Sequence, residues 1–341
     1  MICLKAVCFT NRGKFQIKHI KEPQLQHPDD VKIKVMYAGL CGDDVRVLRG
    51  DLGTFSEEHI MGDEMSGIIT ELSDNAYAAG FRVGNKVSGL ARIFCGHCIF
   101  CVTGRFHACV NMVTDGVMRE YLVLHHQQIC RIPESVDLKT ACLLSTVATC
   151  VCCIERADIR IGNSVILFGA GGFGLLLLQL AQRKGATKIA MVEPVESKRI
   201  LSLQLGAHHV IDPLVENVCA KAFSLTGNIG FDTVIDSSGS IEGFNDGISI
   251  AANLGTVVTL SIYHSDFKYP LDMLDLLWRQ LTIRAIRSPS PLILPQTLPL
   301  LDQLNLHPLT SKLFPIGEID KAWKAFMTGL FPKILIRIHE D

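Results

Sequence analysis

Four cysteines in one short segment constrain the fold of this chain more than any other feature of its sequence. They follow the spacing C-x2-C-x2-C-x7-C and are Cys95, Cys98, Cys101 and Cys109. Four thiolates this close together can hold one tetrahedral zinc ion, and a zinc with four protein ligands has no open position for a substrate. The spacing therefore predicts a structural zinc in a lobe spanning 92–112. Buried thiols or a set of disulfides are the alternatives.

Composition limits the classes of partner. The chain has 341 residues, of which 48% are hydrophobic and 20% charged, and this length predicts two globular domains. A formal net charge of −1 predicts small-molecule partners and neither nucleic acid nor a membrane surface. Charged residues follow soon after the start of the chain, which argues against a signal peptide. The thirteen cysteines then indicate a reducing compartment, the cytoplasm.

The sequence pattern changes near Thr140. Short apolar segments separated by glycine-containing turns come before it, and they are typical of a mostly β domain. From Asn163 onward, strand-like and helix-like segments alternate, which indicates βαβ units around a parallel sheet. The most apolar segment, 165–181, contains four glycines near its start. We therefore expect a strand, a glycine turn and a buried helix there rather than a membrane span.

A glycine-rich loop in this segment has the position of a dinucleotide-binding loop. The pattern G-x-G-x-x-G follows an expected strand and opens an expected helix, and the residues assigned to the site are Gly169, Gly171, Gly172, Phe173 and Gly174. The first glycine permits a tight turn, the second lets the backbone approach a pyrophosphate, and the third lets helix and strand pack closely. Free N–H groups at the helix start then favour the phosphates. A glycine turn that serves packing alone is the alternative.

Glu193 predicts which dinucleotide binds. It ends the next expected strand about twenty residues further on, where an acid accepts hydrogen bonds from the ribose 2′-hydroxyl. A 2′-phosphate about 4 Å from this carboxylate would be repelled by about 4 kcal/mol per charge at an effective dielectric constant of about 20. We therefore expect NAD. NADP is the alternative, because Lys198 and Arg199 lie close enough in sequence to neutralise Glu193.

Five segments together resemble a known family. They are Gly39–Asp44, Met61–Gly67, the four-cysteine lobe, Gly169–Gly174 and Phe314–Ile319. Over nearly the whole chain the sequence resembles the zinc-containing medium-chain alcohol and polyol dehydrogenases, such as sorbitol, threonine and galactitol-phosphate dehydrogenases. The resemblance implies an α/β fold, in which a Rossmann-type doubly wound parallel sheet, 145–287, accompanies a β-rich GroES-like catalytic domain built from 1–144 and 288–341.

The same resemblance implies an activity. Enzymes of this family transfer hydride between NAD and a secondary alcohol, a polyol or a sugar-like substrate, or act on the matching ketone. The resemblance also implies a homodimer or a homotetramer, paired through a strand near 281–283 or through the zinc lobe. A zinc-free NAD(P)H carbonyl reductase of the same fold and a catalytically impaired nucleotide-binding relative are the alternative functions.

The positions that carry the family's catalytic zinc are altered in this chain. Matching the motifs gives Cys41 for the usual cysteine, but Asp63 stands where the family has a histidine and Ser145 stands at the third position. Glu64 is retained beside the altered position. We expect Cys41, Asp63 and Glu64 to be the candidate ligands of a second, catalytic zinc or of another divalent metal, because oxygen ligands favour harder ions.

Two more acids complete the expected catalytic residues. Asp43 stands where the family has the hydroxyl that relays the alcohol proton, and Asp44 keeps the usual acid. A carboxylate at position 43 could serve as a base if burial raises its pKa. Two solvated carboxylates at the start of a helix, favoured there by the helix dipole, are the alternative. The pair His125 and His126 is expected to be exposed and is assigned no chemistry.

Overall fold

The structure is a computed structural model that describes residues 3–11, 13–51, 59–263 and 266–340. The chain divides into two compact units. The β-rich unit consists of 1–148, 288–328 and 333–341, and the parallel-sheet unit consists of 149–287 and 329–332. Both ends of the chain therefore belong to the same unit, and helix α5 (Leu144–Arg156) carries the chain from one unit into the other.

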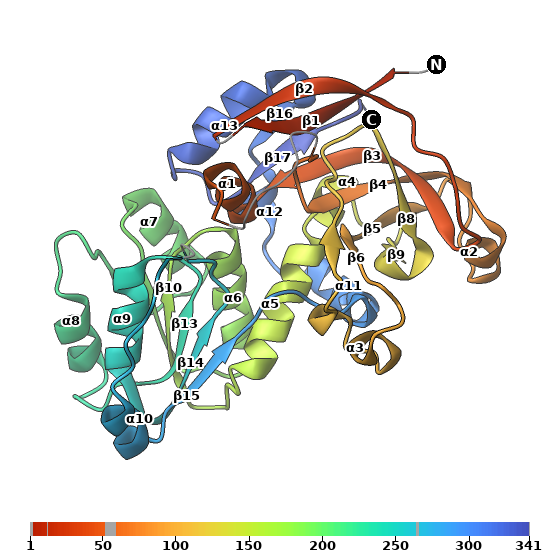
Figure 1. Cartoon of the computed structure of the whole chain (residues 1–341). Helices are drawn as coiled ribbons and strands as arrows, with labels where there is room; N and C mark the ends of the chain where they lie inside the picture. Colours follow the sequence, from red (N-terminus) through yellow and green to blue (C-terminus); the bar gives the residue numbers. More distant parts are fainter. Residues whose placement is uncertain (1–2, 12, 52–58, 264–265, 341) are drawn as a thin grey trace. The chain divides into compact units, whose positions relative to one another are not determined.

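A seven-stranded sheet organises the β-rich unit (Figure 1). Its strand order is β16-β17-β3-β4-β5-β9, and β8 also pairs with β3. The inner strand β3 (Asp30–Leu40) runs antiparallel to β4 (Glu64–Leu72) and to the last strand of the chain, β17 (Ile334–Arg337). The C-terminal strand β17 and its neighbour β16 (Leu313–Pro315) therefore share a sheet with strands from the first half of the chain.

The register of these strands brings distant residues together. Gly39 on β3 lies opposite Glu64 on one side and opposite Leu335 on the other. A Cβ atom on Gly39 would lie 2.2 Å from the Oε2 atom of Glu64. Glycine at this position therefore leaves the space that the glutamate side chain occupies.

The remaining elements of the β-rich unit surround this sheet. The other strands are β1 (Cys3–Asn11), β2 (Lys14–Lys21), β5 (Lys86–Leu90), β6 (Arg92–Ile93), β7 (Val113–Thr114), β8 (Tyr121–His125), β9 (Ile129–Arg131) and β16 (Leu313–Pro315). The α-helices are α1 (Gly42–Arg49), α2 (Asp74–Ala78), α3 (Ile99–Val102), α4 (Leu138–Ala141), α11 (Leu294–Gln303), α12 (His307–Thr310) and α13 (Ile319–Met327). Short 3-10 turns are η1 (Phe106–Ala108), η2 (His126–Gln128), η3 (Pro291–Ile293) and η4 (Ile316–Glu318).

The parallel-sheet unit is built on six strands in the order β12-β11-β10-β13-β14-β15. Every neighbouring pair is parallel, and the order reverses between β10 and β13, as in a doubly wound dinucleotide-binding sheet. The strands are β10 (Ser164–Phe168), β11 (Lys188–Val192), β12 (His209–Ile211), β13 (Phe231–Asp236), β14 (Ala251–Thr259) and β15 (Thr282–Ala285). The helices are α6 (Gly172–Arg183), α7 (Glu196–Gln204), α8 (Val218–Leu225), α9 (Ile241–Ile250) and α10 (Met273–Arg279). The predicted doubly wound parallel sheet is confirmed.

Burial explains why these strands form. Strands that are covered on both faces read as continuous apolar runs, and β10 has the sequence SVILF with four buried residues. Figure 1 shows α6 and α9 on opposite sides of this sheet. Phe168, Phe231 and Val257 belong to the buried cluster of the unit.

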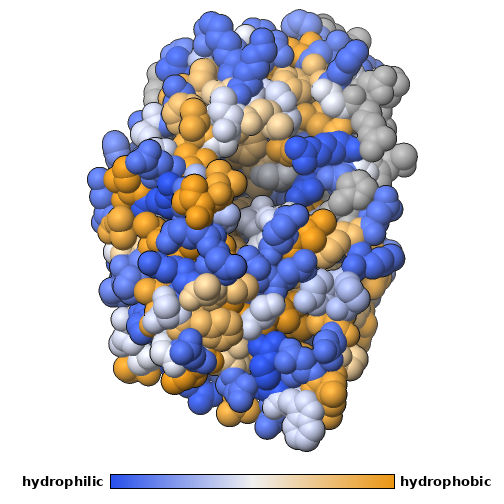
Figure 2. All heavy atoms as spheres, turned by 90° about the vertical axis from the view of Figure 1, so that its left-hand side faces the viewer, coloured by the Kyte–Doolittle hydropathy of each residue, from blue (hydrophilic) through white to orange (hydrophobic). Residues whose placement is uncertain are grey.

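The apolar segment 165–181 consists of β10, the glycine loop and most of α6. Within the described part of the chain, we find no helix with both the length and the apolar character needed to cross a membrane. On the face of the molecule drawn in Figure 2, hydrophobic side chains lie among hydrophilic ones. Between the last strand of the first β-rich segment and β10, the chain forms two helices, α4 and α5, separated by a short turn.

Candidate functional site

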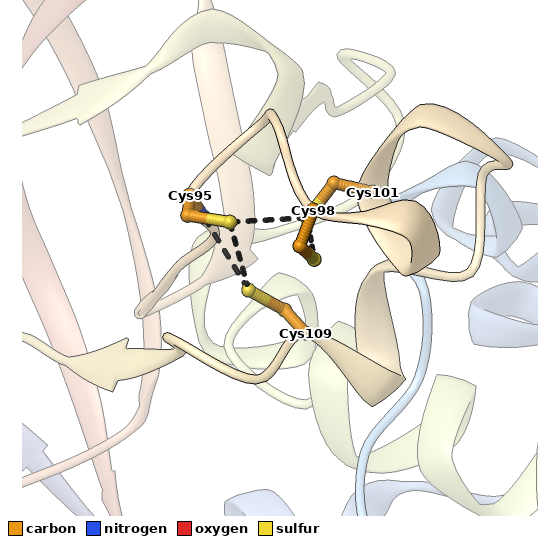
Figure 3. Close-up of side chains that lie close together, drawn as sticks. All are labelled: Cys95, Cys98, Cys101 and Cys109. Carbon is orange, nitrogen blue, oxygen red and sulfur yellow. Dashed lines mark hydrogen bonds between the residues drawn. The ribbon is translucent and has the colours of Figure 1, made fainter.

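The four cysteines lie around one centre (Figure 3). Their sulfur atoms all lie within 4.8 Å of one another. The separations are 3.5 Å for Cys98–Cys101, 3.6 Å for Cys95–Cys109 and 3.9 Å for Cys95–Cys101. A tetrahedral zinc with Zn–S bonds of about 2.3 Å requires sulfur atoms about 3.8 Å apart. The lobe therefore fits a zinc ion with four thiolate ligands.

The glycine loop forms a cradle at the end of β10. Gly169 has a φ of +89°, which permits the tight turn after the strand. A Cβ on Gly174 would lie 1.8 Å from the carbonyl oxygen of Gly169, whereas a Cβ on Gly171 would meet no atom within 4 Å. The short distance at Gly174 requires a glycine there for packing. The open space at Gly171 leaves room at the start of α6. Together these features fit the pyrophosphate of a dinucleotide.

Glu193 lies against this loop. It follows β11 and is buried, and its Oε2 atom accepts a hydrogen bond of 2.7 Å from the backbone N–H of Ala170. Its Oε1 atom accepts one of 3.0 Å from the N–H of Val195 and lies 3.2 Å from the ammonium of Lys198. The structure therefore brings Glu193 and Lys198 together beside the glycine loop, while Gly172 and Phe173 form the first turn of α6.

Arg199 has other partners. Its guanidinium donates to the carbonyl oxygens of Glu193 and Pro194 at 2.8 and 2.7 Å. The same group lies 2.8 Å from the carboxylate of Asp212. These contacts hold the Arg199 side chain, so Lys198 is the cation that directly neutralises the Glu193 carboxylate.

A second cluster, which we call the acidic cluster, contains Cys41, Asp63 and Glu64. One ligand atom of each residue lies within 4.8 Å of the others. Cys41 immediately precedes α1, Asp63 immediately precedes β4, and Glu64 is the first residue of β4. The Oδ1 atom of Asp63 and the Oε2 atom of Glu64 are buried without a hydrogen-bond partner among the described residues. Buried carboxylate oxygens normally have a partner, so this donor set fits a divalent cation.

Two cations lie beside the acidic cluster. The Lys333 ammonium lies 2.5 Å from Glu64 Oε1 and donates to the carbonyl oxygen of Leu40 at 3.2 Å. Arg92 on β6 lies 3.4 Å from Asp63 and 3.6 Å from Asp43. Neither Lys333 nor Arg92 was predicted from the sequence. For Lys333 one signal was present, because it directly precedes a strand whose first three residues are buried.

Asp44 organises the backbone around the acidic cluster. Its carboxylate accepts hydrogen bonds of 2.9 Å from the N–H groups of Cys41 and Gly62. It therefore positions the residues that precede α1 and β4. Asp43 directly precedes Asp44 on α1 and is partly exposed, and Ser145 is buried in the first turn of α5.

Burial makes the acidic cluster favourable for a cation. Burial, assisted by the charge of Asp63, raises the pKa of Asp43 to about 6 and that of Asp44 to about 8. Burial also raises the pKa of the Cys41 thiol and of the Glu64 carboxyl. Positive charge placed among these groups favours their ionised forms.

Comparison with known proteins identifies the family. The sequence profile described as the alcohol dehydrogenase GroES-like domain matches 27–134, and the profile described as zinc-binding dehydrogenase matches 172–303. L-threonine 3-dehydrogenase from Pyrococcus horikoshii is 30% identical over 324 residues, which cover 91% of this chain and 92% of that protein. The chain belongs to the zinc-binding alcohol dehydrogenases.

Further relatives of this dehydrogenase agree with the assignment. Sorbitol dehydrogenase from Halalkalibacterium halodurans is 26% identical and covers 98% of this chain and 99% of that protein. A solved zinc-binding dehydrogenase from Sinorhizobium meliloti, bound to NADP, is 25% identical and has a TM-score of 0.88, covering 99% of this chain and 100% of its own. The predicted family and the predicted combination of GroES-like and Rossmann-type folds are confirmed.

Removing one cysteine tests the zinc lobe of the dehydrogenase. We expect Cys109→Ser to lose one zinc per chain and to unfold at a lower temperature, because zinc binding by four thiolates contributes on the order of 10 kcal/mol. Elemental analysis and thermal unfolding measure both effects. Cys130→Ser is the matched control, since Cys130 is a buried cysteine of the same unit outside the cluster. Unchanged zinc content in Cys109→Ser would contradict the assignment.

Removing Lys333 tests the buried ion pair. Lys333→Met leaves the Glu64 carboxylate, 3% exposed, without its cation, and we expect a loss of about 3–5 kcal/mol in the free energy of unfolding. Urea denaturation measures this loss. The double variant Lys333→Met/Glu64→Gln should recover most of it. Lys321→Met breaks an exposed pair with Glu318 and should cost at most about 1 kcal/mol; equal losses in both single variants would refute the role of burial.

Proposed function

We propose that this dehydrogenase transfers hydride between a nicotinamide dinucleotide and a secondary alcohol, polyol or sugar-like substrate, or its ketone. Relatives named threonine and sorbitol dehydrogenases support a small substrate with hydroxyl groups. The observation that carries the proposal is the acidic cluster, in which two buried carboxylate oxygens have no hydrogen-bond partner among the described residues. The glycine loop supports the dinucleotide.

We assign a second divalent metal, zinc or a harder ion, to Cys41, Asp63 and Glu64. A cation bound there supplies a Lewis acid for the substrate oxygen, and NAD supplies the hydride acceptor. A thiolate and two carboxylates carry more negative charge than one divalent cation balances. Lys333 and Arg92 offset this excess, since each forms an ion pair with one of the two acids.

The residues around the acidic cluster then have distinct roles. Of the two acids that pair with Arg92, Asp43 is the one that accepts the alcohol proton. Its side chain is the more accessible of the two, since it is 37% exposed while that of Asp63 is 19% exposed. Arg92 lies between these two acids and fixes their orientation. Asp44 is a positioning residue, because both of its hydrogen bonds go to the backbone that carries Cys41 and Asp63.

A zinc-free carbonyl reductase is the second candidate function. The observation that favours it is Arg92, which already supplies positive charge to Asp43 and Asp63. A guanidinium can hydrogen-bond a carbonyl oxygen directly. Metal at the acidic cluster separates the candidates: a metal that the wild type holds and Asp63→Asn loses supports the first, and its absence from the wild type supports the second. Binding of NAD without turnover on any substrate would instead indicate the catalytically impaired relative.

Asp63→Asn tests the leading candidate. We expect the wild type to reduce NAD with some members of a panel of polyols and other secondary alcohols, and to hold a metal at the acidic cluster in addition to the structural zinc. The variant should bind the second metal at least about tenfold more weakly and lose turnover in parallel, because one anionic ligand becomes neutral. Asp74→Asn, an exposed acid of the same unit, is the control. Full metal content and full turnover in Asp63→Asn would exclude the proposed site.

We propose NAD rather than NADP as the preferred cofactor, because the buried Glu193 carboxylate lies beside the glycine loop. Glu193→Gln removes the charge, keeps the shape and releases Lys198. We expect its preference for NAD to fall by about tenfold or more, since repulsion of the 2′-phosphate disappears and the released ammonium attracts it. The ratio of kcat/KM for the two cofactors measures this. Glu196→Gln, an exposed neighbour, should change nothing, and an unchanged ratio in Glu193→Gln would refute the assignment.

We propose that the chain forms a homodimer through β15 and α10. β15 is an edge strand of the parallel sheet, and Leu274, Leu277 and Trp278 on α10 are 61%, 68% and 74% exposed. A cluster of large exposed apolar side chains is typical of an interface. Trp278→Glu should shift the protein to monomers in sedimentation velocity, whereas Leu214→Glu on the same unit should not. A tetramer in the wild type would indicate a second interface, and an unchanged dimer in Trp278→Glu would refute this one.

We also propose that the protein functions in the cytoplasm. Four thiols with separations of 3.5 to 3.9 Å must stay reduced to bind zinc. A reducing compartment maintains that state. Subcellular fractionation with a thiol-labelling readout tests this, and recovery of the chain from an exported fraction would contradict it.

A further inference from the structure

A third group of potential metal ligands lies away from both clusters described above. It contains Asp29, His125 and His126, and one ligand atom of each lies within 4.8 Å of the others. Asp29 lies in the turn before β3, His125 ends β8 and His126 begins η2. β3 and β8 are antiparallel with Asp30 opposite His125, so this register brings the three residues together.

The two imidazoles converge on one carboxylate. The Nε2 atom of His126 lies 3.4 Å from Asp29 Oδ1, and the Nε2 atom of His125 lies 3.6 Å from Asp29 Oδ2. The rings stack with a centroid separation of 4.9 Å and an interplanar angle of 25°. Nitrogen and oxygen ligands on a tetrahedral ion with bonds of about 2.0 to 2.1 Å lie about 3.3 Å apart. The observed separations, each to a different oxygen of the Asp29 carboxylate, are close to this value.

Neighbouring residues hold the three side chains in place. The Asn75 side-chain amide donates to Asp29 Oδ1 at 3.0 Å, and the Asn75 backbone N–H donates to the carbonyl oxygen of Pro28 at 2.9 Å. The ring of Phe81 lies 6.2 Å from that of His126. The histidine side chains are 40% and 16% exposed and that of Asp29 is 31% exposed, so a hydrated ion can reach them. The expectation that the histidine pair is exposed is therefore wrong for His126, whose ring is mostly covered.

We propose that Asp29, His125 and His126 form a binding site for a borderline divalent ion such as Zn²⁺, with water in the remaining positions. Two imidazole nitrogens and one carboxylate oxygen are ligands that zinc, nickel and copper prefer. Asn75 then acts as the outer partner that orients the carboxylate ligand. An ion at this site links the turn before β3, the end of β8 and helix α2. This site is separate from the proposed catalytic function and does not depend on it.

One local hydrogen bond must change when the ion binds. The backbone N–H of Gln127 donates to His125 Nδ1 at 3.1 Å, which places the proton of the neutral ring on Nε2. An ion bound to Nε2 displaces that proton and leaves the ring proton on Nδ1. Nδ1 then no longer accepts from Gln127. Ion binding therefore has a spectroscopic signature at His125.

Zinc counting tests the site. The wild-type protein with its resident zinc is dialysed against Zn²⁺, and bound metal is measured alongside Asp29→Asn and His126→Ala. We expect each variant to hold one zinc fewer per chain than the wild type, and Asn75→Ala to bind that zinc about tenfold more weakly. His19→Ala, which removes a single exposed histidine of the same unit, should match the wild type. Equal zinc uptake by all these proteins would overturn the proposal.

A measurement on the unaltered protein avoids any effect of the variants on folding. Long-range ¹H–¹⁵N spectra of uniformly ¹⁵N-labelled wild type report which nitrogen of His125 carries the proton. Titration with Zn²⁺ should move this proton from Nε2 to Nδ1 and shift the Gln127 amide resonance. A His125 ring that keeps the same tautomer at saturating Zn²⁺ would overturn the proposal, whatever the variants bind.

Discussion

The buried ion pair between Glu64 and Lys333 is the interaction on which the β-rich unit depends. Both side chains are less than one-twentieth exposed, at 3% and 4%. Either charge alone in this place would be costly, so the pair penalises any arrangement that separates β4 from the start of β17. The register of β3 satisfies this condition, because Gly39 faces Glu64 and Leu40 faces Ile334. The start of β4 and the last strand, β17, must therefore both be in place for the Glu64 and Lys333 charges to meet.

The same pair determines which atoms the acidic cluster presents. Lys333 occupies Oε1 of Glu64, so Oε2 is the oxygen left to the cluster. Arg92 lies nearest to Oδ2 of Asp63, and Oδ1 is left in the same way. Each acid thus offers one oxygen, and with the Cys41 sulfur they form the three ligands of the proposed metal site. Three protein ligands are what a catalytic metal needs in order to keep a position open for substrate.

Local features of the fold and the site could be predicted from the sequence, and distant ones could not. The four cysteines come from one lobe and the glycine loop from one strand–helix junction, so spacing alone predicts which atoms meet. The place of Glu193 after β11 also follows from the alternation of strands and helices. Lys333 and Arg92 reach the acidic cluster from elements far apart in the chain, and their positions depend on strand register. The His125 and His126 pair meets Asp29 for the same reason, because β3 and β8 are neighbours.

This difference explains how such a fold can persist when the chemistry of its site changes. The zinc lobe takes all four ligands from one continuous segment, so substitutions elsewhere leave its stabilising contribution intact. The acidic cluster takes its ligands from two places, the residue before α1 and the start of β4, and its countercharges from two more. One substitution, such as aspartate at position 63, changes its charge without moving any strand. A carboxylate in a buried site requires a compensating cation nearby, and Arg92, 3.4 Å from Asp63, meets that requirement in this chain.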